Sequence, residues 1–333
     1  MQVCADVTGC ESVDILSAQV LQGFGVAAKK IKKDKSSFVL TTELGSLTIK
    51  KSLDSTAKVT FAHEIKEHLA ANGFTHTDRF KVALSGRPYV ENDGGVYVCT
   101  KTLSLRETNF SDVQDVLRAV ESVARMHRLS LGVGSGSRFR RDNAFGQLQK
   151  DVADMVAIKR RLGTSGSLSD FDVIFLKNYD FYLWQMKETL AELQATRFEK
   201  YMEAALIQSS VIHNRLKEET LLTDGDGTYV VNFGAAEIGY GVFDLVSMIA
   251  RYVRENPNEP QLSVYNLFEA YDTHLALRAE DIRIARALLR FPFRFVKLLR
   301  TYYNKKRTWT PSAIFSKMES IVEARDSYYS QLE

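Results

Sequence analysis

Hydrophobic and polar residues alternate over two short stretches near the amino terminus, residues 37–40 and 47–51. A period of two is typical of a strand with one buried face, so the stretches predict a β-hairpin. In the second stretch Leu47 and Ile49 share one face, whereas Lys50 lies on the polar face. The pattern therefore predicts a sheet that displays a lysine opposite its apolar side.

Apolar residues recur at helical spacing over residues 13–23 and 59–72, and a glycine stands at or just after the end of each stretch. Two further strands are predicted over 81–83 and 95–102, with a hairpin turn at 92–95. The amino-terminal third thus predicts a small sheet accompanied by helices.

Beyond Leu103 the pattern becomes almost entirely helical, with apolar stripes rich in Phe, Tyr and Leu. We expect the first helix there to begin with an N-cap at Ser111 or Asn109. The predicted helices cover 111–129, 145–161, 169–193, 196–209, 241–253, 262–271, 278–289, 291–303 and 314–332. The chain therefore predicts an α+β protein with a β-rich N-lobe at 1–103 and a helical C-lobe at 104–333.

Composition adds limits to this picture. A chain of 333 residues suits about two domains or lobes, and its 45% hydrophobic content allows a sizeable core. Lysine and arginine (44) nearly balance aspartate and glutamate (41), so charge favours neither nucleic acid nor a membrane surface. No run of about 18 apolar residues predicts a membrane span.

Cysteine use and the amino terminus predict where the protein is made. Cys4, Cys10 and Cys99 are too few and too scattered for a disulfide framework or a zinc site. The first residues are polar and lack the basic start and apolar run of a signal peptide. We therefore expect cytoplasmic synthesis, and we expect neither a metal nor another cofactor.

Residues 211–234 have the layout of a kinase catalytic segment: a loop, a hairpin and a second short loop. Kinases carry H-R-D-L-x-x-x-N in the first loop and D-F-G in the second. His213 and Leu216 match the first motif in type and spacing, and Phe233 and Gly234 match the second. The alternative is an unrelated hairpin with residues 224–227 as its turn.

The residues that carry kinase chemistry differ at three positions. Arg215 replaces the aspartate that accepts a proton from the attacking hydroxyl, and a guanidinium does not deprotonate in proteins. Thr220 replaces the metal-binding asparagine, and Asn232 replaces the metal-binding aspartate of D-F-G. Magnesium prefers hard anionic oxygen ligands, so these replacements predict a kinase-like frame without ordinary phosphoryl transfer.

Other positions of a kinase-like frame have candidates. Lys50 stands where a nucleotide-pairing lysine would lie, with Glu64, in preference to Glu67, as its helical partner; a surface lysine and a solvated acid are the alternatives. No glycine-rich loop precedes Lys50. Asp244 suits a structural role in supporting the catalytic loop from below.

Several motifs in order resemble the CotS-type spore coat proteins, within the aminoglycoside phosphotransferase and choline kinase superfamily. The motifs are 67–74 (EHLAANGF), 94–98 (GGVYV), 124–127 (ARMH), 213–222, Asn232-Phe233, and the tail 302–304 with 309–311. The resemblance covers most of the chain and implies a two-lobed protein kinase-like fold and a role in the endospore coat. It also implies other coat proteins as partners.

Three functions remain open. The first is a catalytically inactive pseudokinase that binds or scaffolds during coat assembly. The second is a small-molecule phosphotransferase with rearranged chemistry, in which Glu218 or Glu219, or less directly Asp224 or Asp226, supplies a carboxylate. The third is a metal-independent module in which Arg215 and Lys50 hold a nucleotide or another small anion. The pattern does not assign a role to the pairs Tyr302-Tyr303 and Tyr328-Tyr329.

Overall fold

The structure is a computed structural model that describes residues 16–43, 45–133, 139–224, 227–258, 261–303 and 311–332. Cys4, Cys10 and Asp226 lie outside these residues, as do 304 and 309–310 of the tail motif. Contacts divide the chain into two units, Met1–His63 with Asp78–Ser104 and Glu64–Thr77 with Leu105–Glu333. They are called unit 1 and unit 2 and are described separately.

Unit 1 contains a five-stranded antiparallel sheet with the order β1-β2-β3-β5-β4. Its strands are β1 (Lys30–Asp34), β2 (Ser37–Thr42), β3 (Gly45–Ser52), β4 (Val90–Asn92) and β5 (Gly95–Lys101). The predicted hairpin is confirmed, since Phe38 pairs with Ile49 between β2 and β3. Lys50 lies opposite Ser37 on one side and Val98 on the other.

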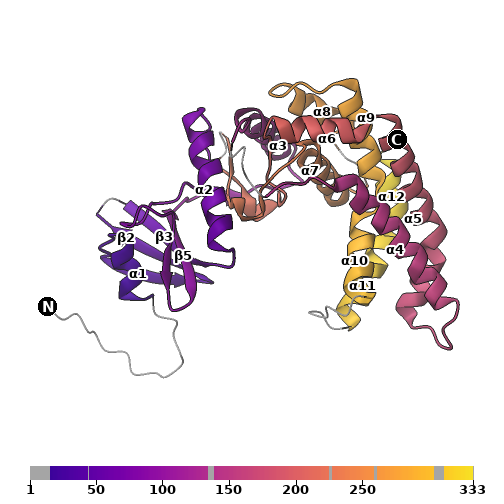
Figure 1. The fold of residues 1–333 in the computed structure, drawn as a ribbon, viewed down its shortest axis with the longest axis horizontal. Helices are drawn as coiled ribbons and strands as arrows, with labels where there is room; N and C mark the ends of the chain where they lie inside the picture. Colours follow the sequence, from indigo (N-terminus) through magenta and orange to yellow (C-terminus); the bar gives the residue numbers. More distant parts are fainter. Residues whose placement is uncertain are drawn as a thin grey trace. The chain divides into compact units, whose positions relative to one another are not determined.

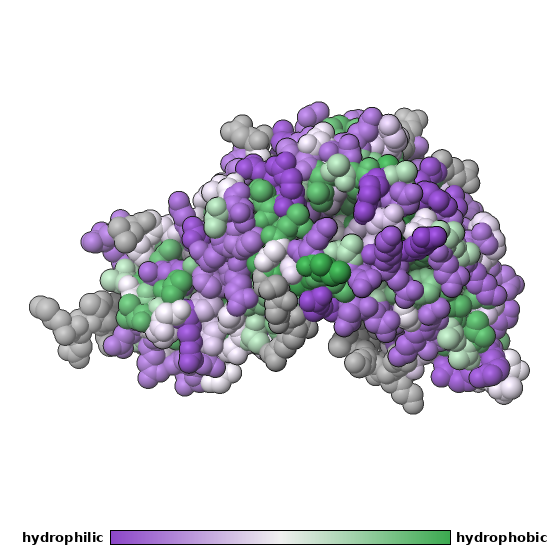
Figure 2. Space-filling model, turned by 45° about the horizontal axis from the view of Figure 1, so that its top comes forward, coloured by the Kyte–Doolittle hydropathy of each residue, from purple (hydrophilic) through white to green (hydrophobic). Residues whose placement is uncertain are grey.

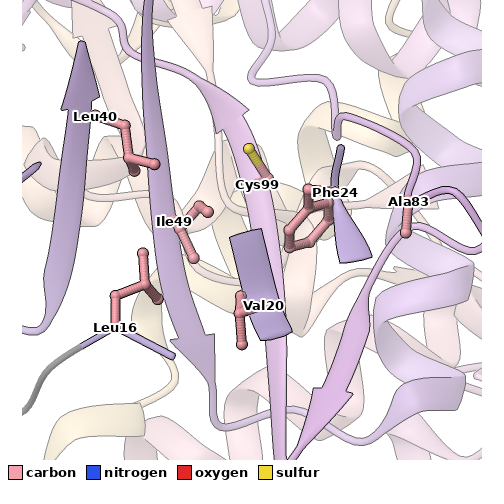
Figure 3. Packing of buried hydrophobic residues seen from close by; sticks show 7 residues of the cluster. All are labelled: Leu16, Val20, Phe24, Leu40, Ile49, Ala83 and Cys99. Carbon is pink, nitrogen blue, oxygen red and sulfur yellow. The ribbon is translucent and has the colours of Figure 1, made fainter. Parts of the chain in front are cut away.

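The core of unit 1 lies between this sheet and the short helix α1 (Ala18–Gly23), as Figure 3 shows. Val20 and Phe24 come from the helix and the residue after it, and they meet Leu40, Ile49 and Cys99 from three strands. Burial raises the pKa of the Cys99 thiol to about 11, so this cysteine is a neutral packing residue at neutral pH.

Two predictions for unit 1 need correction, and a third is confirmed. The first helix begins at Ala18 and not at 13, because Ser17 accepts a hydrogen bond from the Gln19 amide and caps it. Residues 81–83 form no strand, although Phe80 forms an isolated bridge with Thr100 and the Lys81 amide donates to the Cys99 carbonyl at 2.7 Å. The turn at 92–95 is confirmed, and φ is positive at its central residues Asp93 and Gly94.

Helix α2 (Thr56–Ala71) passes from unit 1 into unit 2, since the division falls between His63 and Glu64. Ile65 and Leu69 on its predicted apolar face are fully buried. Gly73 ends the helix with a φ of +87°, a conformation that glycine adopts without strain.

Unit 2 is mostly helical, and its helices are coloured from magenta to yellow in Figure 1. They are α3 (Val113–Leu129), α4 (Ala144–Leu162), α5 (Asp170–Ala195), α6 (Phe198–Ile207), α7 (Val242–Glu255), α8 (Val264–Asp272), α9 (Ala279–Arg290), α10 (Phe293–Tyr303), α11 (Pro311–Glu323) and α12 (Arg325–Ser330). Helix α9 packs against both α5 and α7, and α3 packs against α8. The predicted α+β class is confirmed.

The predicted helices need two corrections beyond small shifts of their ends. Asp112, rather than Ser111 or Asn109, caps α3 by accepting a hydrogen bond from the Asp115 amide. The single helix expected over 314–332 is two helices, α11 and α12, with Ala324 between them. Both errors arise because apolar spacing locates a helix but leaves its ends to local hydrogen bonds.

The tyrosine pairs contribute to packing in unit 2. The Tyr302 ring stacks on Phe171 with centroids 4.0 Å apart, and the Tyr303 hydroxyl donates to Asp172 at 2.6 Å. Tyr328 and Tyr329 donate to backbone carbonyls at the end of α9, each at 3.0 Å. All four rings therefore have structural contacts.

Hydrophilic residues cover most of the face drawn in Figure 2, with hydrophobic residues in small groups among them. None of the helices in the described part of the chain combines the length and the hydrophobicity that a transmembrane span requires.

Candidate functional site

The segment 211–234 folds as three short pieces of β structure in unit 2. Strand β7 (Val211–Ile212) pairs with β10 (Glu237–Ile238), and β8 (Leu221–Thr223) pairs with β9 (Thr228–Val230). Strand β6 (Arg106–Glu107) extends the second pair. A loop with a 3₁₀ turn at Glu218–Thr220 connects β7 to β8, and this is the catalytic-loop-like segment.

Asp244, in the first turn of α7, holds the start of this loop. Its carboxylate accepts hydrogen bonds from the amides of His213 (2.6 Å) and Asn214 (2.8 Å), and a third from His127 Nε2 at 3.1 Å. Complete burial alone would raise the pKa of Asp244, but these donors and the nearby histidines outweigh it and leave the pKa below its usual range. Asp244 is thus an ionised, buried anchor for the loop.

A chain of buried hydrogen bonds also holds the Asp244 carboxylate. His127 Nε2 donates to Asp244, and His127 Nδ1 lies 2.7 Å from the Tyr271 hydroxyl. Burial raises the pKa of Tyr271 well above its ordinary value, so its hydroxyl stays protonated. Gly241 makes room for this contact, because a Cβ there would lie 2.9 Å from His127 Nδ1 and 3.0 Å from the Tyr271 hydroxyl.

His213 ties the first loop to the second. Its Nε2 lies 2.9 Å from the Val231 carbonyl, and its ring meets the edge of Phe233 with centroids 4.9 Å apart. Both residues are buried. The motif positions that the sequence shares with kinases therefore hold the two loops together.

Arg215 and Thr220 behave differently from the residues they replace. The Arg215 side chain is exposed and makes no hydrogen bond or ion pair with any other described residue. The Thr220 hydroxyl lies 2.8 Å from the Arg215 carbonyl and 3.0 Å from the Lys217 carbonyl, and it accepts from the Lys217 amide at 3.0 Å. Thr220 is fully buried, and its hydroxyl connects backbone groups within the same loop.

Asn232 opens the second loop in a left-handed conformation, with φ +66° and ψ +63°. Asparagine tolerates this region better than most residues. The 3₁₀ turn Phe233–Ala235 follows directly. The frame of D-F-G is therefore present, with an amide in place of its carboxylate.

Both loop carboxylates considered as alternative catalysts have basic partners. Glu218 forms an ion pair with Arg251 of α7, whose guanidinium also lies over the Phe110 ring, 5.3 Å from its centroid. Glu219 forms an ion pair with Lys217. Asp224 accepts from the Gly227 amide at 3.0 Å within the hairpin turn.

Sequence reasoning missed a polar cluster beside the loop. Asn214 donates to Glu237 Oε2 at 3.3 Å and accepts from Arg141, which lies 3.5 Å from the same carboxylate. Arg141 also lies over the Phe243 ring, 4.8 Å from its centroid. The pairing of β7 with β10 and the bridge of Arg140 to Ile238 bring these residues together, so no local pattern could have indicated the cluster.

The other two sequence-predicted candidates fall in different units. Lys50 is half-buried on β3 in unit 1, whereas Glu64 is exposed on α2 in unit 2 with Arg215. An approach of Lys50 to either residue stays a prediction.

The donor set in unit 2 does not fit magnesium bound to a nucleotide triphosphate. Arg215 repels a cation, the Thr220 oxygen is engaged within the loop, and Asn232 supplies at most a neutral ligand. In the described residues no group of three His, Cys, Asp or Glu side chains is placed to hold a metal.

The fold is that of the kinase-like phosphotransferases. A structure of an aminoglycoside phosphotransferase from Alicyclobacillus acidocaldarius aligns with a TM-score of 0.83 at 18% identity, covering 97% of this chain and 96% of that one. Spectinomycin phosphotransferase APH(9)-Ia, with ADP and spectinomycin, aligns at 0.62 with 10% identity, covering 96% and 99%. At such identities the likeness concerns the fold alone, and it confirms the predicted two-lobed class.

The family itself follows from the sequence. The family described as "Spore coat putative kinase YutH" matches residues 18–333, and the chain belongs to it. The predicted resemblance to CotS-type spore coat proteins is thereby confirmed. No curated protein matches the sequence.

Proposed function

We propose that this protein is a catalytically inactive kinase-like component of the spore coat that acts by binding or scaffolding. One observation carries the proposal: Asp244 and His213 hold the loop in place, while the three positions of kinase chemistry carry Arg215, Thr220 and Asn232. General base catalysis alone contributes roughly 100- to 10,000-fold, and an arginine does not supply it.

The setting follows from the family description, which names the spore coat. We accordingly propose other coat proteins as partners and the spore coat as the place of action. The test is the position of a fluorescent fusion during sporulation. Diffuse cytoplasmic fluorescence in mature spores would contradict the proposed location.

The absence of kinase chemistry is tested by thermal unfolding with and without Mg²⁺ and ATP, together with an assay of ATP turnover. A ligand that binds only the folded state raises the unfolding temperature. We expect no such magnesium-dependent rise and no turnover, because the loop lacks the carboxylates that would hold the metal. The matched variant is Arg215→Asp/Asn232→Asp, which restores two carboxylates and leaves the Thr220 contacts intact. A magnesium-dependent shift in that variant alone supports the proposal, and turnover by the wild type rejects it.

The second candidate is metal-independent binding of a small anion, and the exposed, unpartnered guanidinium of Arg215 favours it. Arginine binds phosphate and carboxylate groups in a bidentate manner. Nucleotide binding measured in EDTA should then be lost in Arg215→Ala and retained in Arg128→Ala, which removes an exposed arginine of α3. Lys50→Met tests whether the lysine of unit 1 contributes.

The third candidate, a phosphotransferase with rearranged chemistry, rests on the exposed carboxylate of Glu219 in the loop. ATP turnover abolished by Glu219→Gln would favour it. Turnover that survives this change but not Glu218→Gln would move the role to the carboxylate paired with Arg251.

A further inference from the structure

A mainly apolar pocket lies in the helical part of unit 2. Six helices contribute to it, with Val246 and Ala250 from α7, Leu288 from α9, Phe295 from α10 and Ile321 from α11 among the lining residues. Its cavity volume is about 90 Å³. None of the kinase-motif residues lines it, so the pocket is separate from the candidate site described above.

Tyrosines form much of the pocket wall, and their hydroxyl groups contact backbone carbonyls. The hydroxyl of Tyr328 donates to the Leu289 carbonyl at 3.0 Å, and that of Tyr182 lies 3.5 Å from the Ile321 carbonyl. Burial raises the pKa of each to about 12, so both are neutral at physiological pH. These side chains therefore offer the pocket their rings rather than free hydroxyl groups.

Three arginines line the same pocket, and they differ in their partners. Arg325 forms an ion pair with Asp326 and donates to Asn178. Arg254 and Arg294 make no hydrogen bond or ion pair with any residue that the structure describes. The pocket thus presents two guanidinium groups without a carboxylate.

The surroundings of Arg254 make this arrangement unfavourable without an anion. Burial, together with the charge of Arg294, lowers the pKa of Arg254 to about 10, so the side chain is still charged at neutral pH. The nearby Glu255 lies 3.9 Å from Arg251, and Asp326 is engaged by Arg325. A partly desolvated cation gains from any anion that replaces its lost hydration.

We propose that this pocket binds a small organic carboxylate, with its apolar group among the aliphatic and aromatic side chains and its carboxylate on Arg254 and Arg294. A guanidinium fork fits a carboxylate in bidentate geometry, and apolar contact supplies the rest of the affinity. A cavity of about 150 Å³ holds benzene. The smaller cavity here suits a short branched aliphatic chain better than a ring, so isovalerate is the probe of choice. The site is independent of the function proposed above.

The test is a calorimetric titration of the full chain with isovalerate and, in parallel, with isovaleramide, which has the same shape without the charge. We expect saturable binding of isovalerate at one site and at least about tenfold weaker binding of the amide, because the charge-assisted hydrogen bonds are absent. Equal binding of the two compounds, or no binding of the acid, overturns the proposal. This comparison uses only the wild-type protein.

Two variants then place the ligand in the pocket. Arg254→Met removes the guanidinium and should abolish discrimination between acid and amide, whereas Arg160→Met, at an exposed arginine of α4, should leave it unchanged. Ala250→Leu fills the apolar part without altering charge and should weaken binding of both compounds. Isovalerate binding that persists in both Arg254→Met and Ala250→Leu, with circular dichroism showing folded protein, overturns the assignment.

Discussion

At the scale of single residues, Asp244 holds the loop although it lies outside the two kinase-like motifs. This buried carboxylate receives hydrogen bonds from two backbone amides of the loop and from His127. It keeps its charge in the interior because each of these donors compensates for lost hydration. These contacts therefore stabilise the loop independently of whether it catalyses a reaction.

Replacing this anchor should be costly. Asp244→Asn removes the charge and turns one acceptor toward the amides of His213 and Asn214 into a donor. We expect the free energy of unfolding to fall by about 3 kcal/mol, as when one partner of a buried charged network is lost. Urea unfolding measures it, with Asp180→Asn as the control at an exposed ion pair to Lys159. Similar losses in the two variants would show that Asp244 is no anchor.

Thr220 gives a second prediction at this scale. Thr220→Val keeps the shape but removes the hydroxyl that contacts the Arg215 and Lys217 carbonyls and the Lys217 amide. We expect a loss of about 1–2 kcal/mol and faster hydrogen exchange at the amides of the loop. Thr301→Val is the control, since its exposed hydroxyl bonds only to its own helix at the Lys297 carbonyl. Unchanged exchange in the loop contradicts the role given to Thr220.

At the scale of elements, regular patterns were readable and contacts between distant segments were not. The apolar stripe of α2 and the turn of β4–β5 were predictable because each depends on neighbouring residues. The contact of His127 with Tyr271 joins residues 144 positions apart, and only the packing of α3 on α8 creates it. The ion pair of Glu218 with Arg251 likewise depends on how α7 meets the loop.

For the candidate site residues too, local patterns were predictable and contacts between distant segments were not. The replacements at Arg215, Thr220 and Asn232 were visible because the motif fixes their spacing. The hydrogen bond from the Thr220 hydroxyl to the Arg215 carbonyl was not predictable, because a threonine in the sequence does not reveal which carbonyl it contacts. The pocket with Arg254 is lined by residues of six helices, so no local pattern in the sequence indicated it.

The junction before α7 supports a prediction about how closely elements approach. A Cβ at Gly241 would lie 2.9 Å from His127 Nδ1, so Gly241→Ala must displace α3 or α8. We expect a loss of about 1–3 kcal/mol, the usual cost of overpacking. Gly163→Ala is the control, because its Cβ would lie 3.5 Å from the nearest atom. A neutral Gly241→Ala would mean that this junction is loose.

At the scale of the whole molecule, three carboxyl groups of unit 2 have a pKa that the folded structure lowers. Burial alone would raise the pKa of Asp172, Asp244 and Asp281, but hydrogen bonds outweigh it and hold each pKa below its usual range. The donors are Tyr303 and Ser169, His127 and His213, and Arg278 and Tyr240 respectively. These contacts link α5 to α10, α3 to α7, and the segment just before α7 to α9.

Stability should therefore depend on pH in a defined direction. A carboxyl with a lowered folded pKa stabilises the fold fully above its unfolded pKa of about 4, and this contribution is lost as pH falls toward the folded pKa. We expect the free energy of unfolding, measured by urea titration and circular dichroism, to be level near neutral pH and to decline below about pH 4. Asp281→Asn should lower stability near pH 7 and flatten the decline, because the variant has one fewer proton to take up on unfolding in acid. A wild-type profile that stays level to about pH 2, or a variant with the same slope, would show that these acids are not the linkage between pH and the fold.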